Sequence, residues 1–317
     1  MRTLTLNPVI PGPVFGKRVI LPSGPDTGRP HRRLGSRVLP REALGSAARF
    51  ADWSRGQGGG HRRYRREGSW RKLGTDGLTT PSPPDMPTAL ITGSSRGLGL
   101  EWARQCAERG WRVVATCRSP GSAGDLQALA SQHHNVTVHR LDVAAPDQLA
   151  DLAQTLTNDS LDLLVNNAAV YFEHYGRDPV GGIDYDAWQE TFRVNTLGPM
   201  RVTEALLPQL ARGERPLVLA ISSNMGSIAG IDTPRNYAYR SSKAALNAAM
   251  RGLAEELRPN GIGILLLHPG WVRTRMGGSS ASTLPEESVR GMLALVDRFT
   301  LEMSGQFLRG DGTPLPW

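Results

Sequence analysis

Short apolar runs alternate with helical patterns from residue 88 onward, and this alternation restricts the possible folds more than any other feature. Strands are expected at 88–92, 112–116, 136–140, 161–165, 216–221 and 262–267, with a short last one at 306–308. Helices are expected between them, at 98–109, 146–157, 186–211 and 238–257. Such alternation is typical of parallel strands joined by right-handed crossovers. We therefore predict an α/β fold with a doubly wound parallel sheet and a site at the carboxyl ends of its strands.

A glycine-rich turn, Thr92-Gly93-Ser94-Ser95-Arg96-Gly97-Leu98-Gly99, follows the first expected strand. In the helix that comes next, Leu98, Trp102 and Cys106 are spaced to share one buried face. Glycines here permit a tight turn and a close backbone approach, and a helix N-terminus can hold a pyrophosphate. The spacing is G-x-x-x-G-x-G, which differs from the G-x-G-x-x-G of many dinucleotide sites. In this strand–turn–helix context the turn predicts a Rossmann-type site.

The second expected strand ends in Cys117-Arg118, without the acidic residue that usually binds the ribose hydroxyls of NAD. Arg96 adds a second guanidinium within the glycine turn. Arginine binds phosphate in a bidentate manner, so the pair suits a 2′-phosphate. The sequence favours NADPH (or NADP+) over NADH. The alternative is that both are ordinary surface arginines.

Tyr239 and Lys243 lie four residues apart in an expected helix, so both side chains fall on one face. The lysine cation favours the phenolate and lowers the tyrosine pKa from its usual value of about 10. Such a tyrosine can give a proton to a carbonyl oxygen. Tyr237 is six residues from Lys243 and falls on another face. The alternative is a chance pair on a solvated helix.

Polar or glycine-containing motifs follow the other strands as well. They are Asp142-Val143, Asn166-Asn167-Ala168-Ala169, Ser222-Ser223 and Pro269-Gly270 with Thr274. Because they all fall at strand ends, the fold would gather them at one edge of the sheet. Only one serine of the pair can point into the site, and spacing does not decide which.

With these motifs in this order, the chain from Met86 to the C-terminus resembles the short-chain dehydrogenase/reductases. The resemblance selects Ser223, Tyr239 and Lys243 as the catalytic serine, tyrosine and lysine. It matches Asn195 with an asparagine that holds a water between the lysine and solvent. The expected cofactor-binding residues are Gly93, Ser95, Arg96, Gly97, Leu98, Gly99, Arg118, Asp142, Val143, Asn167, Ala168, Tyr239, Lys243, Pro269, Gly270, Val272 and Thr274.

Finer details resemble the sniffer-like, or C-factor-like, carbonyl reductases. The interval from Ser223 to Tyr239 is longer than is common in the family, and the segments 237–243, 268–274 and 311–317 match that subgroup. One departure is Arg275, where the subgroup often carries Asp. It falls in residues 271–284, which we expect to form a mobile lid over the substrate, and it leaves substrate preference open.

The resemblance implies an NADPH-dependent oxidoreductase that reduces an aldehyde or ketone to an alcohol. An alcohol dehydrogenase and a 3-oxoacyl reductase of the same family remain alternatives, because the chemistry is reversible. A low-turnover, cofactor-binding signalling protein is an alternative of another class. The expected partner is a small carbonyl substrate, with no nucleic acid and no membrane, in a cytoplasmic protein; a homodimer or homotetramer remains open.

Residues 1–85 differ in composition from the remainder. They hold 16 of the 37 Lys and Arg residues and 6 of the 29 Asp and Glu residues, a net charge of +10. With glycine and proline throughout and no apolar period, they read as a disordered basic leader before a single domain at 86–317. The leading explanation is upstream sequence translated before a physiological start at Met86; a transit peptide and a basic tether to nucleic acid or anionic membrane are alternatives.

Cys106 and Cys117, the only two cysteines, read as buried thiols without a disulfide. No Cys/His cluster has metal-ligand spacing, and we expect no metal site.

Overall fold

The computed structural model of the chain describes residues 86–173 and 179–317. The predictions for residues 1–85, including disorder and a start at Met86, lie outside the described residues. The described strands are β1 (Thr88–Thr92), β2 (Arg112–Cys117), β3 (Val136–Arg140), β4 (Leu163–Asn166), β5 (Leu217–Ile221), β6 (Gly263–His268) and β7 (Phe307–Arg309). The described α-helices are α2 (Gly97–Glu108), α3 (Gly124–Gln132), α4 (Pro146–Thr155), α5 (Tyr185–Phe192), α6 (Gly198–Ala205), α7 (Leu207–Leu210), α8 (Tyr237–Leu257) and α9 (Pro285–Asp297).

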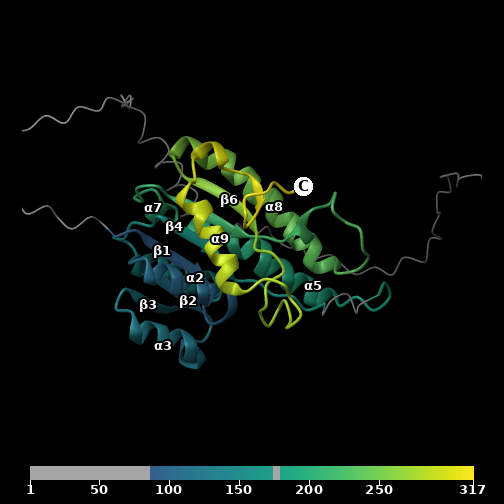
Figure 1. The fold of residues 1–317 in the computed structure, drawn as a ribbon, viewed down its shortest axis with the longest axis horizontal. Helices are drawn as coiled ribbons and strands as arrows, with labels where there is room; N and C mark the ends of the chain where they lie inside the picture. Colours follow the sequence, from purple (N-terminus) through teal and green to yellow (C-terminus); the bar gives the residue numbers. More distant parts are fainter. Residues whose placement is uncertain (1–85, 174–178) are drawn as a thin grey trace, which may run out of the picture. The chain divides into compact units, whose positions relative to one another are not determined.

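The strands form one parallel sheet in the order β3-β2-β1-β4-β5-β6-β7 (Figure 1). Strand order reverses between β1 and β4, and ligands of open α/β sheets bind in the crevice at such a point. The inner strands read as continuous apolar runs because both faces are covered; β1, β5 and β6 are buried at every position. The predicted doubly wound sheet is confirmed.

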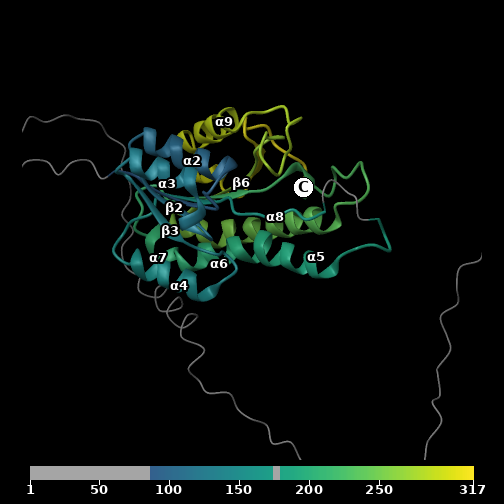
Figure 2. The ribbon, with the colours of Figure 1, turned by 90° about the horizontal axis from the view of Figure 1, so that it is seen from below.

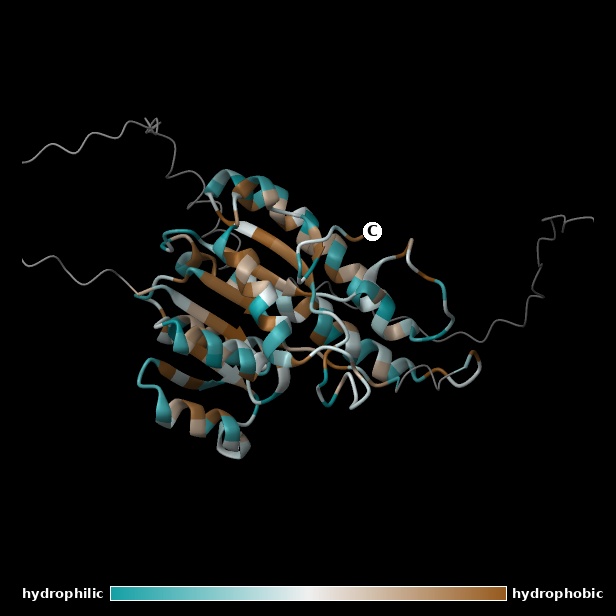
Figure 3. Ribbon diagram, in the orientation of Figure 1, coloured by the Kyte–Doolittle hydropathy of each residue, from teal (hydrophilic) through white to brown (hydrophobic). Residues whose placement is uncertain are grey.

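Helices cover both faces of the sheet, as Figure 2 shows from the side. On one face α2, α3 and α9 pack side chains such as Trp102, Leu126 and Met292 against the strands. On the other, α4, α6 and α8 contribute Leu152, Val202 and others. In Figure 3 the strands are the most apolar part of the fold and the helices are mixed. Each core is therefore built from the alternate strand faces and one apolar stripe per helix.

The single helix expected over 186–211 is instead interrupted. A π-helical turn, η3 (Arg193–Leu197), separates α5 from α6, and α7 follows as a further short helix. Proline cannot donate a backbone hydrogen bond, and Pro199 and Pro208 lie at the second positions of α6 and α7. The π turn contains Asn195. Such turns are frequent at functional sites.

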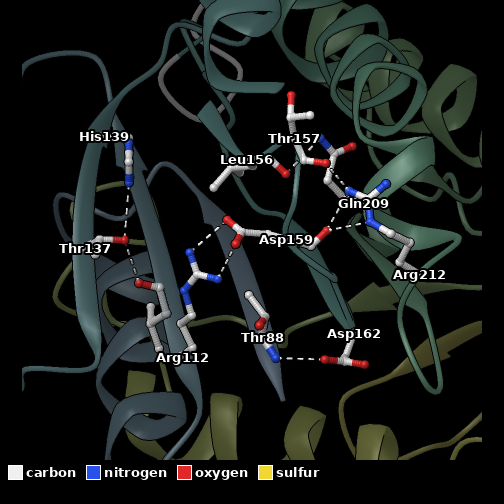
Figure 4. A network of polar contacts seen from close by, with 11 residues as sticks. Thr88, Arg112, Thr137, His139, Leu156, Thr157, Asp159, Asp162, Gln209 and Arg212 are labelled. Carbon is white, nitrogen blue, oxygen red and sulfur yellow. Dashed lines mark hydrogen bonds and ion pairs between the residues drawn. The ribbon is translucent and has the colours of Figure 1, made fainter. Parts of the chain in front are cut away.

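Polar contacts occupy the amino ends of the strands, opposite the expected site (Figure 4). Arg112, which begins β2, pairs with Asp159 through two hydrogen bonds of 2.7 and 2.8 Å. Arg212 donates to the Asp159 carbonyl at 2.7 Å, and the Thr88 amide donates to Asp162 at 2.8 Å. These contacts tie the segment 159–162 to the amino ends of β1 and β2.

Three further features concern the described residues. None of their helices is both long and apolar enough to cross a membrane. They also contain no group of three His, Cys, Asp or Glu side chains that could hold a metal ion. Cys106 and Cys117 are buried free thiols, and burial raises the pKa of Cys106 to about 12.

Candidate active site

A cavity of about 1080 Å³ opens at the carboxyl edge of the sheet, where strand order reverses. Most of the residues predicted from sequence line it: Gly93, Ser95, Arg96, Gly97, Leu98, Gly99, Arg118, Asp142, Val143, Asn167, Ala168, Tyr239, Lys243, Pro269 and Thr274. Four predicted residues do not form its wall, namely Asn195, Ser223, Gly270 and Val272. Residues from β1, β2, β3, β4 and β6 ends thus meet at one place, as their spacing predicted.

The glycine turn is shaped to admit a ligand close to its backbone. Gly93 and Gly97 have φ of +72° and +57°, values that side chains disfavour. A methyl group at Gly99 would overlap the Gly93 carbonyl and approach Asn167 Nδ2 to 2.5 Å. Asn167 Nδ2 donates to the Thr92 carbonyl at 2.8 Å, which fixes the turn to the end of β4. The turn leads directly into the N-terminus of α2, where first-turn amides can bind phosphate; these are features expected of a dinucleotide site.

A smaller cavity of about 400 Å³ adjoins the turn beyond β2. Arg96 and Arg118 line it, and both are exposed. Asp125, in the first turn of α3, also lines it. The strand-end prediction missed this carboxylate because it belongs to the next helix. Two cations and one anion give the cavity a net positive charge, which suits a phosphate.

Tyr239 and Lys243 occupy one face of α8, as their spacing predicted. The Lys243 Nζ lies 5.8 Å from the centre of the Tyr239 ring and donates to the Ile221 carbonyl at 2.8 Å. Lys243 is 3% exposed, and burial lowers its pKa to about 8. Lys243 is also the only lysine after residue 85. A buried ammonium beside a phenol favours the phenolate, so the pair can exchange a proton with a bound substrate.

The serine pair after β5 divides its contacts. Ser222 forms part of the cavity wall, but its hydroxyl donates to Asn247 Oδ1 at 2.6 Å in the core. Ser223 Oγ accepts from the Met225 amide at 3.1 Å and donates to Asn224 at 3.3 Å. The Ser222 hydroxyl is thus committed to α8, and the choice of Ser223 stays a prediction.

Asn195 lies in the π turn and is fully buried. Its side chain accepts from the Val170 amide at 2.8 Å and donates to the Val170 carbonyl at 2.9 Å. It also donates to Ser242 Oγ on α8 at 3.2 Å. These bonds join the segment after β4 to α8. The role of Asn195 in holding a water between Lys243 and solvent stays a prediction.

The segment expected to form a lid begins after β6 and contacts the glycine turn. The methyl group of Thr274 lies against Gly97, so that a Cβ on Gly97 would approach it to 3.3 Å. Val272 pairs with Thr283 in an isolated bridge, and Gly270 has φ of +89°. Gly270 and Val272 therefore shape the segment without lining the cavity. Arg275 and Met276, both exposed, line the cavity beside it.

Sequence reasoning missed three residues that arrange the site. Thr92 Oγ1 accepts from the amides of Asn167 and Ala168, each at 3.0 Å. Tyr171 and Glu173 contact the start of α8. Thr92 ends a strand directly before the glycine turn, which is a usable signal. Tyr171 and Glu173 gave none, since their partners lie about 65 residues away in the chain.

Comparison with known proteins agrees with this geometry. Residues 87–285 match the family model described as short chain dehydrogenase. "C-signal" of Myxococcus xanthus is 44% identical over 165 residues, which are 52% of this chain and 98% of that protein.

Two solved carbonyl reductases have the same fold. The NADPH-bound enzyme from chicken fatty liver is 32% identical, with a TM-score of 0.67, and covers 73% of this chain and 99% of its own. Carbonyl reductase Sniffer of Drosophila melanogaster is 31% identical, also with a TM-score of 0.67, and covers 73% of this chain and 100% of its own. The chain belongs to the short-chain dehydrogenase/reductase family of NAD(P)-dependent oxidoreductases.

Proposed function

We propose that this protein uses NADPH to reduce an aldehyde or ketone to an alcohol, with Tyr239 as the proton donor. The observation that carries the proposal is the buried Lys243 ammonium, held 5.8 Å from the Tyr239 ring on the wall of the cavity. Both solved relatives described above are named carbonyl reductases, and one was solved with NADPH.

In this proposal the bound nicotinamide supplies the hydride. Tyr239 gives its hydroxyl proton to the carbonyl oxygen, and Lys243 lowers the tyrosine pKa and binds the nicotinamide ribose. Ser223 donates a hydrogen bond to the same oxygen and stabilises the charge that develops there. Asn195 would hold a water that connects Lys243 to solvent, and a proton from solvent would replace the one that Tyr239 gives. The glycine turn and the α2 N-terminus hold the pyrophosphate, and Arg96 and Arg118 bind the 2′-phosphate.

A panel of aldehydes and ketones with NADPH and with NADH, followed by loss of nicotinamide absorbance, tests the proposal. Turnover should be found and should be higher with NADPH. Tyr239→Phe removes the proton donor and little volume, so reduction should fall by about a hundredfold or more while NADPH binding is retained. Turnover of the Phe variant within about tenfold of the parent would contradict the role of Tyr239.

A signalling role is a second candidate, and the resemblance to "C-signal" favours it. The intact Tyr239–Lys243 pair argues for turnover. The same panel separates the two candidates, because a cofactor-binding signalling protein would bind NADPH without oxidising it on any carbonyl.

A further inference from the structure

The first turn of α8, which carries Tyr239, is capped by an acidic side chain from a distant part of the chain. Glu173, in the segment between β4 and α5, accepts from the Ala238 amide at 3.0 Å and from the Tyr239 amide at 2.7 Å. Glu173 is 9% exposed. First-turn amides of a helix have no partner within the helix, and Glu173 satisfies two of them.

The residue that would ordinarily cap this helix is used otherwise. An N-cap residue usually has an extended backbone and a side chain that accepts from these amides. Asn236 instead has φ of +57° and makes no side-chain cap. Its Oδ1 accepts from the Tyr171 hydroxyl at 2.6 Å. Arg235 also has a positive φ, of 74°. Two successive residues therefore have a left-handed backbone directly before α8.

The same short segment holds the ring of Tyr239. The Tyr171 ring meets it edge to face, with 4.9 Å between ring centres. Tyr171 thus contacts the ring and the helix entry, and Glu173 contacts the backbone amide. The contacts of this segment fix both ends of Tyr239, its main chain and its side chain.

The charge of Glu173 opposes the other charges at this place. Lys243 lies one turn further along α8, and Arg240, the next residue after Tyr239, donates to Thr233 Oγ1 at 2.8 Å. Both cations and the positive end of the helix favour the phenolate of Tyr239. Among the described residues, Tyr171 and Tyr237 are further titratable side chains close to Tyr239 in space or in sequence. Within residues 86–173 and 179–317, no Lys, Arg or His forms an ion pair with Glu173. Its anion therefore acts on the helix start and disfavours the phenolate.

We propose that Glu173 positions Tyr239 and, through its negative charge, extends to higher pH the range over which Tyr239 keeps the proton that it donates. Glu173 touches neither substrate nor cofactor in this proposal; it acts through Tyr239. The inference rests on the proposed role of Tyr239 as the proton donor.

Glu173→Gln tests the charge, because glutamine keeps the shape and one acceptor. The pH profile of kcat/KM is measured for carbonyl reduction, which needs the phenol, and for alcohol oxidation, which needs the phenolate. In the reduction profile kcat/KM falls as Tyr239 loses its proton, and in the oxidation profile it rises; these two limbs should move to lower pH. The expected shift is about half a unit to one unit, as for one charge at a helix end. Asp184→Asn is the matched control: Asp184 caps α5 by accepting from the Ala187 amide at 2.9 Å, and its loss should leave both limbs in place.

Glu173→Asp tests the position, because aspartate keeps the charge but is too short to bond both amides. Its kcat should fall severalfold with unmoved limbs and unchanged NADPH binding. Limbs that stay in place in Glu173→Gln would overturn the charge effect, and a parent-like kcat in Glu173→Asp would overturn the positioning role. If thermal unfolding showed that the Gln variant does not fold, the Asp variant would still test both parts: a parent-like kcat would overturn the positioning role, and a pH profile that moves although the charge is kept would overturn the charge effect.

Tyr239→Phe separates this inference from the proposed function. An active Phe variant would remove the basis of both. An inactive Phe variant together with a Gln variant that has an unmoved profile would defeat the role of Glu173 only.

Discussion

At the scale of single residues, the candidate site contains a buried cation, the Lys243 ammonium, whose burial lowers the stability of the folded protein. Lys243 is buried, and its one described hydrogen bond is to the neutral Ile221 carbonyl. No carboxylate among the described residues forms an ion pair with it. An ammonium without an anion in the core destabilises the folded state. A loss of stability at a residue of the candidate active site is what a trade between stability and activity predicts.

Lys243→Met should change the pH dependence of stability in a defined direction. The folded-state pKa of Lys243, about 8, lies below the usual lysine value of 10.5. The buried ammonium therefore destabilises the folded parent fully below pH 8. This destabilisation disappears as the pH rises from about 8 to the lysine pKa of the unfolded chain. The difference in free energy of unfolding, variant minus parent, should fall by roughly 1–3 kcal/mol across that interval. Urea unfolding at a series of pH values measures it.

The pKa of Lys243 can also be measured directly, because the chain has only three lysines, Lys17, Lys72 and Lys243, whose signals can be told apart. With isotope-labelled lysine, an NMR titration of the cofactor-free protein should show one side chain that titrates near pH 8. Its signal should vanish in Lys243→Met. Three signals that all titrate near 10.5 would contradict the burial argument.

Cofactor preference is the second prediction at this scale. The double variant Arg96→Ala/Arg118→Ala should raise the KM for NADPH at least tenfold, because it removes two charge-assisted bonds to the 2′-phosphate. NADH kinetics should stay nearly unchanged. Arg251→Ala is the control, since Arg251 pairs with Glu255 on α8 and does not line either cavity. Equal losses with both cofactors would show that these arginines do not distinguish them.

At the scale of elements, the strands and their end motifs were predictable because their signals are local. A buried parallel strand is a short apolar run, and a glycine turn or an N-N-A-A run follows it directly. The interruption of 186–211 was not predicted. Pro199 and Pro208 were a local signal for breaks near α6 and α7, whereas the contacts of Asn195 in the π turn with Val170 and Ser242 involve other elements. The cap that Glu173 forms on α8 was not predicted either, because its partners lie in another element.

The glycine turn gives a prediction about an element. Gly99→Ala should abolish or weaken cofactor binding by at least tenfold, because the added methyl overlaps the Gly93 carbonyl and so displaces the turn. Gly252→Ala is the matched control: it lies within α8 and its Cβ would meet nothing within 4 Å. That control should gain about 0.5–1 kcal/mol of stability. Titration of NADPH fluorescence, with thermal unfolding as the check on folding, measures both.

At the scale of the whole molecule, sequence predicted where the site would form but not every contact within it. Parallel topology alone brings Gly93, Asp142, Asn167 and Pro269 to one edge of the sheet, so that their order along the chain sufficed. Which serine hydroxyl faces the substrate, and which acid caps α8, depend on rotamers and on packing between elements. Those properties have no local signature in the sequence.

The last prediction concerns residues 1–85. A chain that begins at Met86 should fold, bind NADPH and turn over carbonyls like the full chain, because residues 86–317 supply all the proposed site residues and the described helices on both faces of the sheet. The match to the chicken carbonyl reductase spans 99% of that enzyme and 73% of this chain. Residues 86–317 make up the same share, 73%, of this chain. NADPH titration, steady-state kinetics and urea unfolding of both chains measure the effect.

A chain that begins at Leu90 is the control. It should unfold, because it lacks the first residues of β1, which begins at Thr88 with its amide bonded to Asp162. Loss of NADPH affinity or solubility in the Met86 chain, with the full chain intact, would show that residues 1–85 contribute to the fold.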